Sequence, residues 1–234
     1  MTVHAREPRS RRERPAKPAL TRAGIVATAV ELMRAEGLER VTMRRLAQEL
    51  DTGPASLYVY VRNTAELHAA VLDELLGAVD RAGDSADGDV GSGADGDWRD
   101  RLVRVLTSYI EVLFEHPALA RSALVARPSG PHYLDLVEAV LALLDEGGVA
   151  PAQAARAVDL LLQFATSTAA EQSTRGEDIG AQDDWDALTA TLRGVSPERH
   201  PHIAALGDEL LAGTGRERLA WGFRTLIDGV LAGP

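Results

Sequence analysis

Apolar residues recur at spacings of three and four along most of the chain, and this pattern predicts α-helices. The first such stretch runs from Leu20, with Thr21 as a helix N-cap and Gly37 as the stop. A second helix is expected to begin at Thr42, and Pro54 is suited to the first turn of a third. No segment shows the alternation typical of a strand, so we predict an all-α protein.

The same pattern continues through the rest of the chain. Asn63 is expected to cap a fourth helix, where Glu66 completes a pair like a capping box. A polar stretch over 177–199 is expected to hold at most a short helix around Trp185–Leu192. Four longer helices are expected at Trp98–Phe114, Tyr133–Leu144, Pro151–Gln172 and Arg216–Leu231.

A run rich in Gly, Asp and Ser at 84–97 separates the first four expected helices from the later ones. Such a run buries too little apolar surface to order itself, so we interpret it as a flexible connection. The predicted division is a disordered basic arm at 1–19, a small DNA-binding domain at 20–77, a helix end with a linker at 78–97 and a larger helical domain at 98–234.

The net charge of −10 is distributed unevenly. Residues 1–64 contain 12 Lys and Arg against 7 Asp and Glu, a net charge of +5, whereas the remainder has a net charge of −15. A basic N-terminal part joined to an acidic body is typical of a DNA-binding protein with a separate second domain. The arm at 1–19 either contacts DNA or forms a solvated tail, and its composition leaves both open.

The sequence lacks the motifs of an enzyme. It has no cysteine, no glycine-rich phosphate loop after a strand, no serine in a nucleophile elbow and no HExxH motif. His200 and His202 flank Pro201 in what we expect to be a polar loop, and without a third ligand they predict no metal site. We expect no cofactor and no metal. No apolar run reaches the roughly 18 residues of a membrane span, and the absence of cysteine fits the cytoplasm.

The second and third expected helices have the layout of a helix-turn-helix. Ala47 is the small residue at the crossing, Gly53 relieves the turn, and Leu57 with Val61 holds the third helix against the second. The remaining positions after Gly53 then face outward, where small and hydroxyl groups can enter a major groove. The alternative for the tyrosines of this segment is that they belong to the core.

Residues 41–76, VTMRRLAQELDTGPASLYVYVRNTAELHAAVLDELL, resemble the DNA-binding domain of TetR-family repressors. The family pattern is a Thr-capped helix, Leu-Ala and a later Leu, a turn, and then Leu-Tyr followed by an aromatic or His and by Asn or Ser. The resemblance extends over 20–77. It implies a dimeric transcriptional regulator with a small N-terminal domain on double-stranded DNA and a larger helical domain that binds an effector.

The resemblance implies phosphate contacts at two places. Thr42, Tyr58 and Tyr60 would contact phosphates from the helix-turn-helix. Asn63 and Thr64, which open the fourth helix, would hold a further phosphate. Thr64 stands where the family often has Lys, so a shallower dependence of DNA affinity on salt is expected.

The resemblance also implies contacts near the bases. Pro54, Ala55 and Ser56 at the start of the recognition helix would meet base edges, and Arg44 would reach a base edge or a phosphate. Asp51 departs from the family pattern, which usually has Gly at this position.

The last helix carries an apolar stripe that resembles the closing helix of the family. In the family this helix pairs with a preceding long helix and with their symmetry mates in a four-helix bundle. The alternative is an ordinary core helix within one chain. The predicted dimer-interface residues are Val158, Leu161, Leu162, Leu219, Phe223, Leu226, Ile227 and Val230.

Residues 98–171 resemble the tetracycline-repressor-like branch, in which an interior cavity binds the inducer. The histidine that chelates drug-bound magnesium in the tetracycline repressor has no counterpart here, so the predicted effector is a small apolar or amphipathic molecule. The candidate cavity residues, for which plain core packing is the alternative, are Phe114, Leu124, Tyr133, Gln163, Phe164 and Glu171.

The predicted function is a repressor that a small molecule releases from a palindromic operator. The alternative is a DNA-binding regulator that needs no ligand and is gated by a protein partner.

Overall fold

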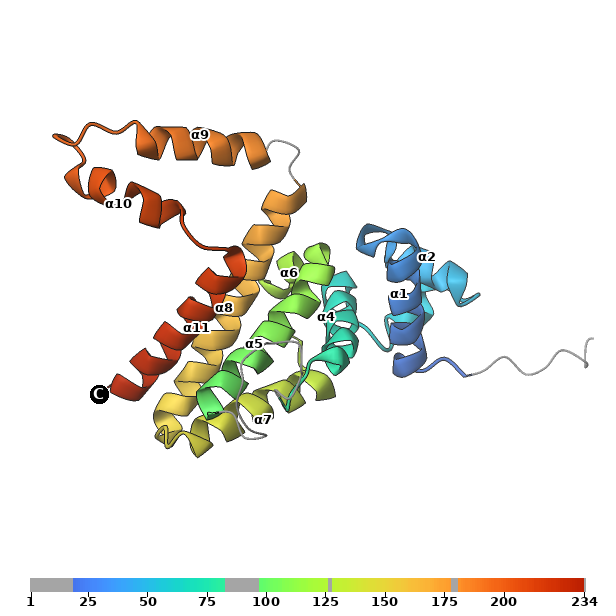
Figure 1. The fold of residues 1–234 in the computed structure, drawn as a ribbon. Helices are drawn as coiled ribbons and strands as arrows, with labels where there is room; N and C mark the ends of the chain where they lie inside the picture. The colour runs from blue at the N-terminus through green and yellow to red at the C-terminus, as the bar shows by residue number, and fades with distance from the viewer. Residues whose placement is uncertain (1–18, 83–96, 126–127, 178–180, 234) are drawn as a thin grey trace, which may run out of the picture.

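The computed structural model describes residues 19–82, 97–125, 128–177 and 181–233. Regular structure in these ranges is entirely helical, as predicted. Figure 1 shows a small N-terminal head, a larger body and a pair of helices that projects from the body. The predicted arm at 1–19, except its last residue, and most of the predicted linker lie outside the described residues.

The head consists of the first elements of the chain, which are α1 Arg22–Glu36, the 3₁₀ turn η2 Leu38–Arg40, α2 Met43–Glu49 and α3 Pro54–Leu57. The predicted N-caps are confirmed: the Thr21 hydroxyl accepts from the amide of Gly24, and Thr42 likewise caps α2. Gly37, at a φ of 90°, ends α1 with its amide donating to the Met33 carbonyl.

Helix α4, Thr64–Leu75, links the head to the body and continues into the 3₁₀ turn η3, Leu76–Ala78. Asn63 caps it as predicted, because its side chain accepts from the Glu66 amide. The Glu66 carboxylate accepts from the amide of Arg62, one residue earlier than in a standard capping box. Helix α4 packs on α1 on one side and on α6 and α7 on the other, so one apolar core runs through head and body.

The body is built around α5 Trp98–Glu115, which packs against α7, α8 and α11. The fully buried residues of α5, such as Leu102, Leu106 and Ile110, recur along one face of the helix and explain its position at the centre. Its neighbours are α6 Pro117–Ala123, α7 Pro131–Glu146, α8 Pro151–Glu177 and α11 Gly215–Ala232.

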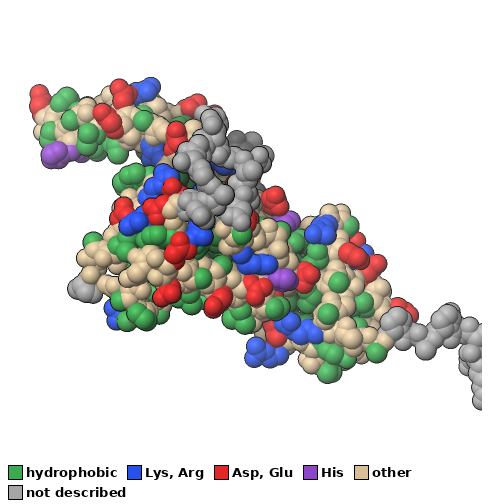
Figure 2. All heavy atoms as spheres, turned by 60° about the horizontal axis from the view of Figure 1, so that its bottom comes forward, with side chains coloured by type: hydrophobic (Ala, Val, Ile, Leu, Met, Phe, Trp, Pro, Cys, Tyr) green, Lys and Arg blue, Asp and Glu red, His purple; other side chains and the backbone are tan. Residues whose placement is uncertain are grey.

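Two helices, α9 Ala181–Arg193 and α10 Pro201–Leu211, form a helical arm that is distinct from the basic segment at 1–19. They pack mainly on each other and stand apart from the body (Figure 1). The sequence prediction was wrong here: α9 is longer than the expected short helix, and Pro201 begins a helix instead of lying in a loop. The arm keeps large apolar side chains exposed, and hydrophobic groups show on its surface in Figure 2.

Helix α6 was also not anticipated. Pro117 follows the end of α5 and occupies the first turn of a new helix, where its missing N–H costs nothing. None of the helices in the described ranges combines the length and the apolar character needed to cross a bilayer.

Candidate DNA-contacting surface and ligand cavity

The segment after Gly53 presents small side chains to solvent. Pro54, Ala55 and Ser56 are all exposed, while Leu57 is fully buried against the rest of the head. The α-helix ends at Leu57, earlier than the sequence predicted, and hydrogen-bonded turns continue the chain to Val61. The exposed surface of α3 is therefore a single turn that can approach a base edge without bulky side chains.

The two tyrosines that follow α3 differ in burial. Tyr58 is 53% exposed, whereas Tyr60 is half-buried and packs against the core. Tyr58 can therefore place its hydroxyl on a phosphate directly. Tyr60 packs on the core with part of its side chain and leaves the rest exposed to solvent.

The turn between α2 and α3 explains why an aspartate is tolerated where the TetR pattern usually has glycine. Asp51 has a φ of 47°, in the left-handed region. Glycine adopts this conformation without cost, and Asp and Asn are the side chains that tolerate it best. The amide of Thr52 donates to the Ala47 carbonyl across this turn at 2.8 Å.

The capping side chains at the starts of α2 and α4 remain able to donate. The Thr42 Oγ1 accepts from the Arg45 amide at 3.2 Å, and the Asn63 Oδ1 accepts from the Glu66 amide at 2.8 Å. A hydroxyl hydrogen and an amide NH₂ group are then left for an incoming phosphate. Thr64, in the first turn of α4, is also exposed.

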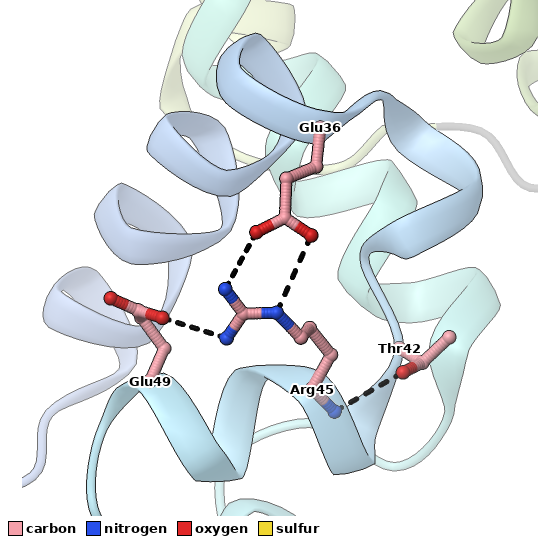
Figure 3. A network of polar contacts seen from close by, with 4 residues as sticks. All are labelled: Glu36, Thr42, Arg45 and Glu49. Carbon is pink, nitrogen blue, oxygen red and sulfur yellow. Dashed lines mark hydrogen bonds and ion pairs between the residues drawn. The ribbon is translucent and has the colours of Figure 1, made fainter.

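Adjacent arginines at the start of α2 have different surroundings. Arg45 reaches Glu36 of α1, with Nη2 2.6 Å from Oε1, and also Glu49 of its own helix, with Nη1 2.7 Å from Oε2 (Figure 3). Hydrogen bonds to Glu36 and then Glu49 raise the pKa of Arg45, and the bond from Arg45 lowers the pKa of Glu36. Arg45 thus joins α1 to α2 and has its charge compensated. Arg44 is exposed and makes no ion pair with the described residues.

A small cavity in the body lies between α5, α6, α7 and α8. Three of the six predicted ligand residues, Leu124, Tyr133 and Gln163, line it together with Tyr109 and Thr166. The Tyr109 hydroxyl lies 2.8 Å from the Thr166 hydroxyl. The cavity measures about 100 Å³, and it combines aromatic walls with a few polar groups.

The other predicted ligand residues lie elsewhere. Phe114 lines a separate hollow of about 240 Å³ between α5, α8 and α11. Phe164 packs edge-on against Phe223, with ring centroids 5.3 Å apart, and closes the contact between α8 and α11. Glu171 is exposed on α8.

Comparison with known proteins identifies the family of the chain. Residues 25–71 match "Bacterial regulatory proteins, tetR family", and residues 91–233 match "Tetracyclin repressor-like, C-terminal domain". The chain belongs to the TetR family. The family resemblance predicted from residues 41–76 is confirmed, as is the tetracycline-repressor-like branch.

Two transcriptional regulators are similar to this chain over nearly its whole length. The HTH-type transcriptional repressor DrrR1 of Streptomyces coeruleorubidus is 30% identical over 226 residues, which are 94% of this chain and 80% of that protein. The crystal structure of SCO7704 from Streptomyces, described as a transcription regulator, is 57% identical with a TM-score of 0.75 and covers 93% of this chain and 98% of its own.

A further TetR-family protein has been solved with a bound ligand. ActR of Streptomyces coelicolor, solved in complex with actinorhodin, is 34% identical with a TM-score of 0.75, over 92% of this chain and 97% of its own. These similarities establish a DNA-binding regulator with a helix-turn-helix and a C-terminal domain of the type that binds ligands.

The residues predicted for the TetR-type dimer interface lie mostly inside the protomer. Of these, Leu226 and Val230 are half-buried, and six are buried in the chain's own core: Val158, Leu161, Leu162, Leu219, Phe223 and Ile227. The apolar stripe identified α8 and α11 as a packed pair, but periodicity cannot tell the side of a helix that faces its own chain from the side that faces a partner.

Proposed function

We propose that the chain is a repressor that binds a palindromic operator as a homodimer and is released by a small apolar or amphipathic molecule. The observation that carries this proposal is the cavity beside Tyr133, because its wall α7 also packs on α4, which joins the head to the body. Occupation of the cavity can therefore act on the head through directly packed helices.

For DNA, the proposal assigns base contacts to Pro54, Ala55 and Ser56 and phosphate contacts to the surrounding polar groups. Their exposure and their small size support this assignment. Arg44 would approach a phosphate or a base edge, since its charge is not compensated by a described neighbour. Phosphate contacts are assigned to Thr42, Tyr58, Tyr60, Asn63 and Thr64.

For the effector, the lining of the cavity favours a molecule with an apolar face and a few hydrogen-bonding groups. Leu124 and Tyr133 supply apolar surface, and Gln163 and Thr166 supply polar atoms. Cavities that enclose small molecules typically measure about 300–1,000 Å³, so a cavity of about 100 Å³ has to open to admit one. Actinorhodin, bound by ActR, is a suitable first probe.

For the dimer, the proposal assigns the outer faces of α8 and α11. Leu160 is 43% exposed on α8, and Trp221 is 70% exposed on α11. Around them lie uncharged exposed positions at helical spacing, Ser167 on α8 and Thr225 with Gly229 on α11. A large exposed aromatic group is typical of the centre of an interface.

The test is displacement of the protein from DNA by a ligand. We expect actinorhodin, or an amphipathic compound that raises the unfolding temperature, to weaken binding to a duplex from the region upstream of the gene. A compound that stabilises the protein yet binds equally well with and without DNA would contradict the release mechanism. If no compound in a broad screen shifts the unfolding temperature, a regulator gated by a protein partner is favoured instead.

A further inference from the structure

A carboxylate is buried where the head meets the body. Asp73, on α4, is only 7% exposed. Its Oδ1 accepts a hydrogen bond of 2.9 Å from the backbone amide of Tyr133, in the first turn of α7. Burying a carboxylate is costly unless it is hydrogen-bonded, so this contact is a specific feature of the junction.

Helix α7 lacks a capping side chain of its own. Its N-cap residue is Gly130, and the amide of Tyr133, three residues later, is the one that an N-cap side chain normally binds. Asp73 of α4 replaces that missing cap from another helix. Its negative charge also suits the positive end of the α7 dipole.

Gly130 leaves the space that Asp73 needs. A Cβ atom at position 130 would lie 2.0 Å from the Asp73 Oδ2, which is not a possible contact. The φ of Gly130 is −88°, which any residue adopts. Glycine is therefore required here by the approach of Asp73, and not by the backbone conformation.

Tyr133 takes part in two contacts at once. Its backbone amide holds Asp73, and its side chain lines the cavity of about 100 Å³. A molecule that enlarges this cavity has to displace its walls, of which the first turn of α7 is one. Movement of that turn would pull directly on α4.

The junction has room for such a movement. A hollow of about 270 Å³ lies between the start of α1, α4 and the loop before α7, and its lining includes Arg22, Glu66, Asp73 and Gly130. Side chains of both charges gather where the head meets the body (Figure 2). Open space on this side leaves room for α4 to move relative to the loop before α7.

We propose that Asp73 is a positioning residue that transmits the state of the cavity to the DNA-binding head through the first turn of α7. The proposal rests on the function proposed above. Helix α4 also packs on α6, which gives a second route between the same parts. The test must therefore break the Asp73 contact alone.

Two variants break the contact from opposite sides. Asp73→Ala removes the acceptor, and Gly130→Ala adds the Cβ atom that expels the carboxylate while Asp73 itself is retained. Asp73→Asn keeps an acceptor oxygen and should preserve the coupling. Thr214→Ala is the matched control, because it removes the cap of α11, far along the chain from the junction.

The measurement is hydrogen exchange of the peptide over 131–137 in the full-length protein, with and without a duplex from the region upstream of the gene. Because coupling is reciprocal, DNA bound to the head should alter exchange in the first turn of α7 in the wild type, Asp73→Asn and Thr214→Ala. Asp73→Ala and Gly130→Ala should exchange there roughly tenfold faster, bind the duplex within about threefold of the wild type, and show no response to it.

The outcomes separate the two proposals. If the wild type binds the duplex but exchange in α7 does not change, or if the two contact-breaking variants respond like the wild type, the role of Asp73 is overturned and the proposed function stands. If the wild type binds no duplex from this region, the proposed function fails and the role of Asp73 fails with it.

Discussion

Arg44 and Arg45 are neighbours in the sequence, but they offer different amounts of charge to DNA. Arg45 is held between two glutamates, and its pKa is raised by its hydrogen bonds to Glu36 and Glu49. Arg44 is exposed and not paired within the described ranges. At the residue scale, Arg44 is therefore the one of these two arginines that offers an uncompensated charge to DNA.

This difference predicts that substitution of Arg44 affects DNA binding and that substitution of Arg45 affects stability. Arg44→Ala should leave the unfolding temperature unchanged and lower the slope of log affinity against log salt by about one, because one phosphate contact is lost. Arg45→Ala should lower the unfolding temperature slightly, since the pair is exposed and screened. Titrations at several salt concentrations, with thermal melts, measure both. An equal salt slope for the wild type and Arg44→Ala would contradict the assignment.

Tyr58 and Ser56 should also behave differently. Tyr58→Phe removes a hydroxyl proposed to bind a phosphate, so affinity for specific and random duplexes should fall alike, by about 1 kcal/mol. Ser56→Ala should change the ranking of duplexes that differ in one base pair. Competition binding against a set of single-base variants measures this. The groove assignment is wrong if Ser56→Ala leaves the ranking unchanged.

The sequence was sufficient to predict capping residues, but it gave no prediction of contacts between side chains on different helices. Thr21, Thr42 and Asn63 act within one turn of their own helices, so a local pattern is sufficient to find them. The partner of Arg45 is Glu36, on another helix, and Asp73 binds an amide 60 residues away. Such pairs depend on how helices pack. No local signal marked Asp73, because at helical spacing it falls on the side of α4 with Glu66 and Ala69, away from the apolar stripe.

At the scale of elements, the helices found from the sequence are those with a buried stripe. Helix α5 has a strong one, whereas no residue of α10 is buried. The spacing of apolar residues therefore could not reveal α10, because none of its residues is buried in a core. Pro201 was interpreted as a loop residue and no helix was expected to begin at Pro117, although proline is well suited to a first turn.

Two half-buried histidines predict how stability depends on pH. Burial lowers the pKa of His68, on α4, and of His116, at the start of α6, below the usual 6.5. The unfolded chain then binds more protons than the folded one as the pH falls. The free energy of unfolding therefore does not depend on these histidines above pH 6.5, and it declines as the pH falls below that value. The carboxylates with lowered pKa values lose their contribution only at more acidic pH.

Thermal melts between about pH 7 and pH 5 test this prediction. The unfolding temperature of the wild type should fall across this interval, and a variant with both His68→Gln and His116→Gln should fall less. His200→Gln is the control, because His200 is exposed. Identical pH profiles for the wild type and the double variant would contradict the role of these histidines.

At the scale of the whole molecule, Trp221 is the largest exposed apolar group on the pair α8 and α11. If it lies at the centre of the dimer interface, Trp221→Ala should weaken self-association about thirtyfold. Leu134→Ala is the control, since Leu134 is 60% exposed but lies on α7 and not on this pair. Sedimentation velocity over a range of concentrations measures both. An unchanged dimer in Trp221→Ala would place the interface elsewhere.

The central claim is that two copies of the exposed turn α3 bind one duplex in successive major grooves. The direct measurement is the affinity and stoichiometry of the purified protein on short duplexes tiled across the region upstream of its gene, at low salt. The account predicts two protomers on one tile, bound at least about 10³-fold more tightly than on random DNA. A monomer, or equal affinity for every tile, would contradict it.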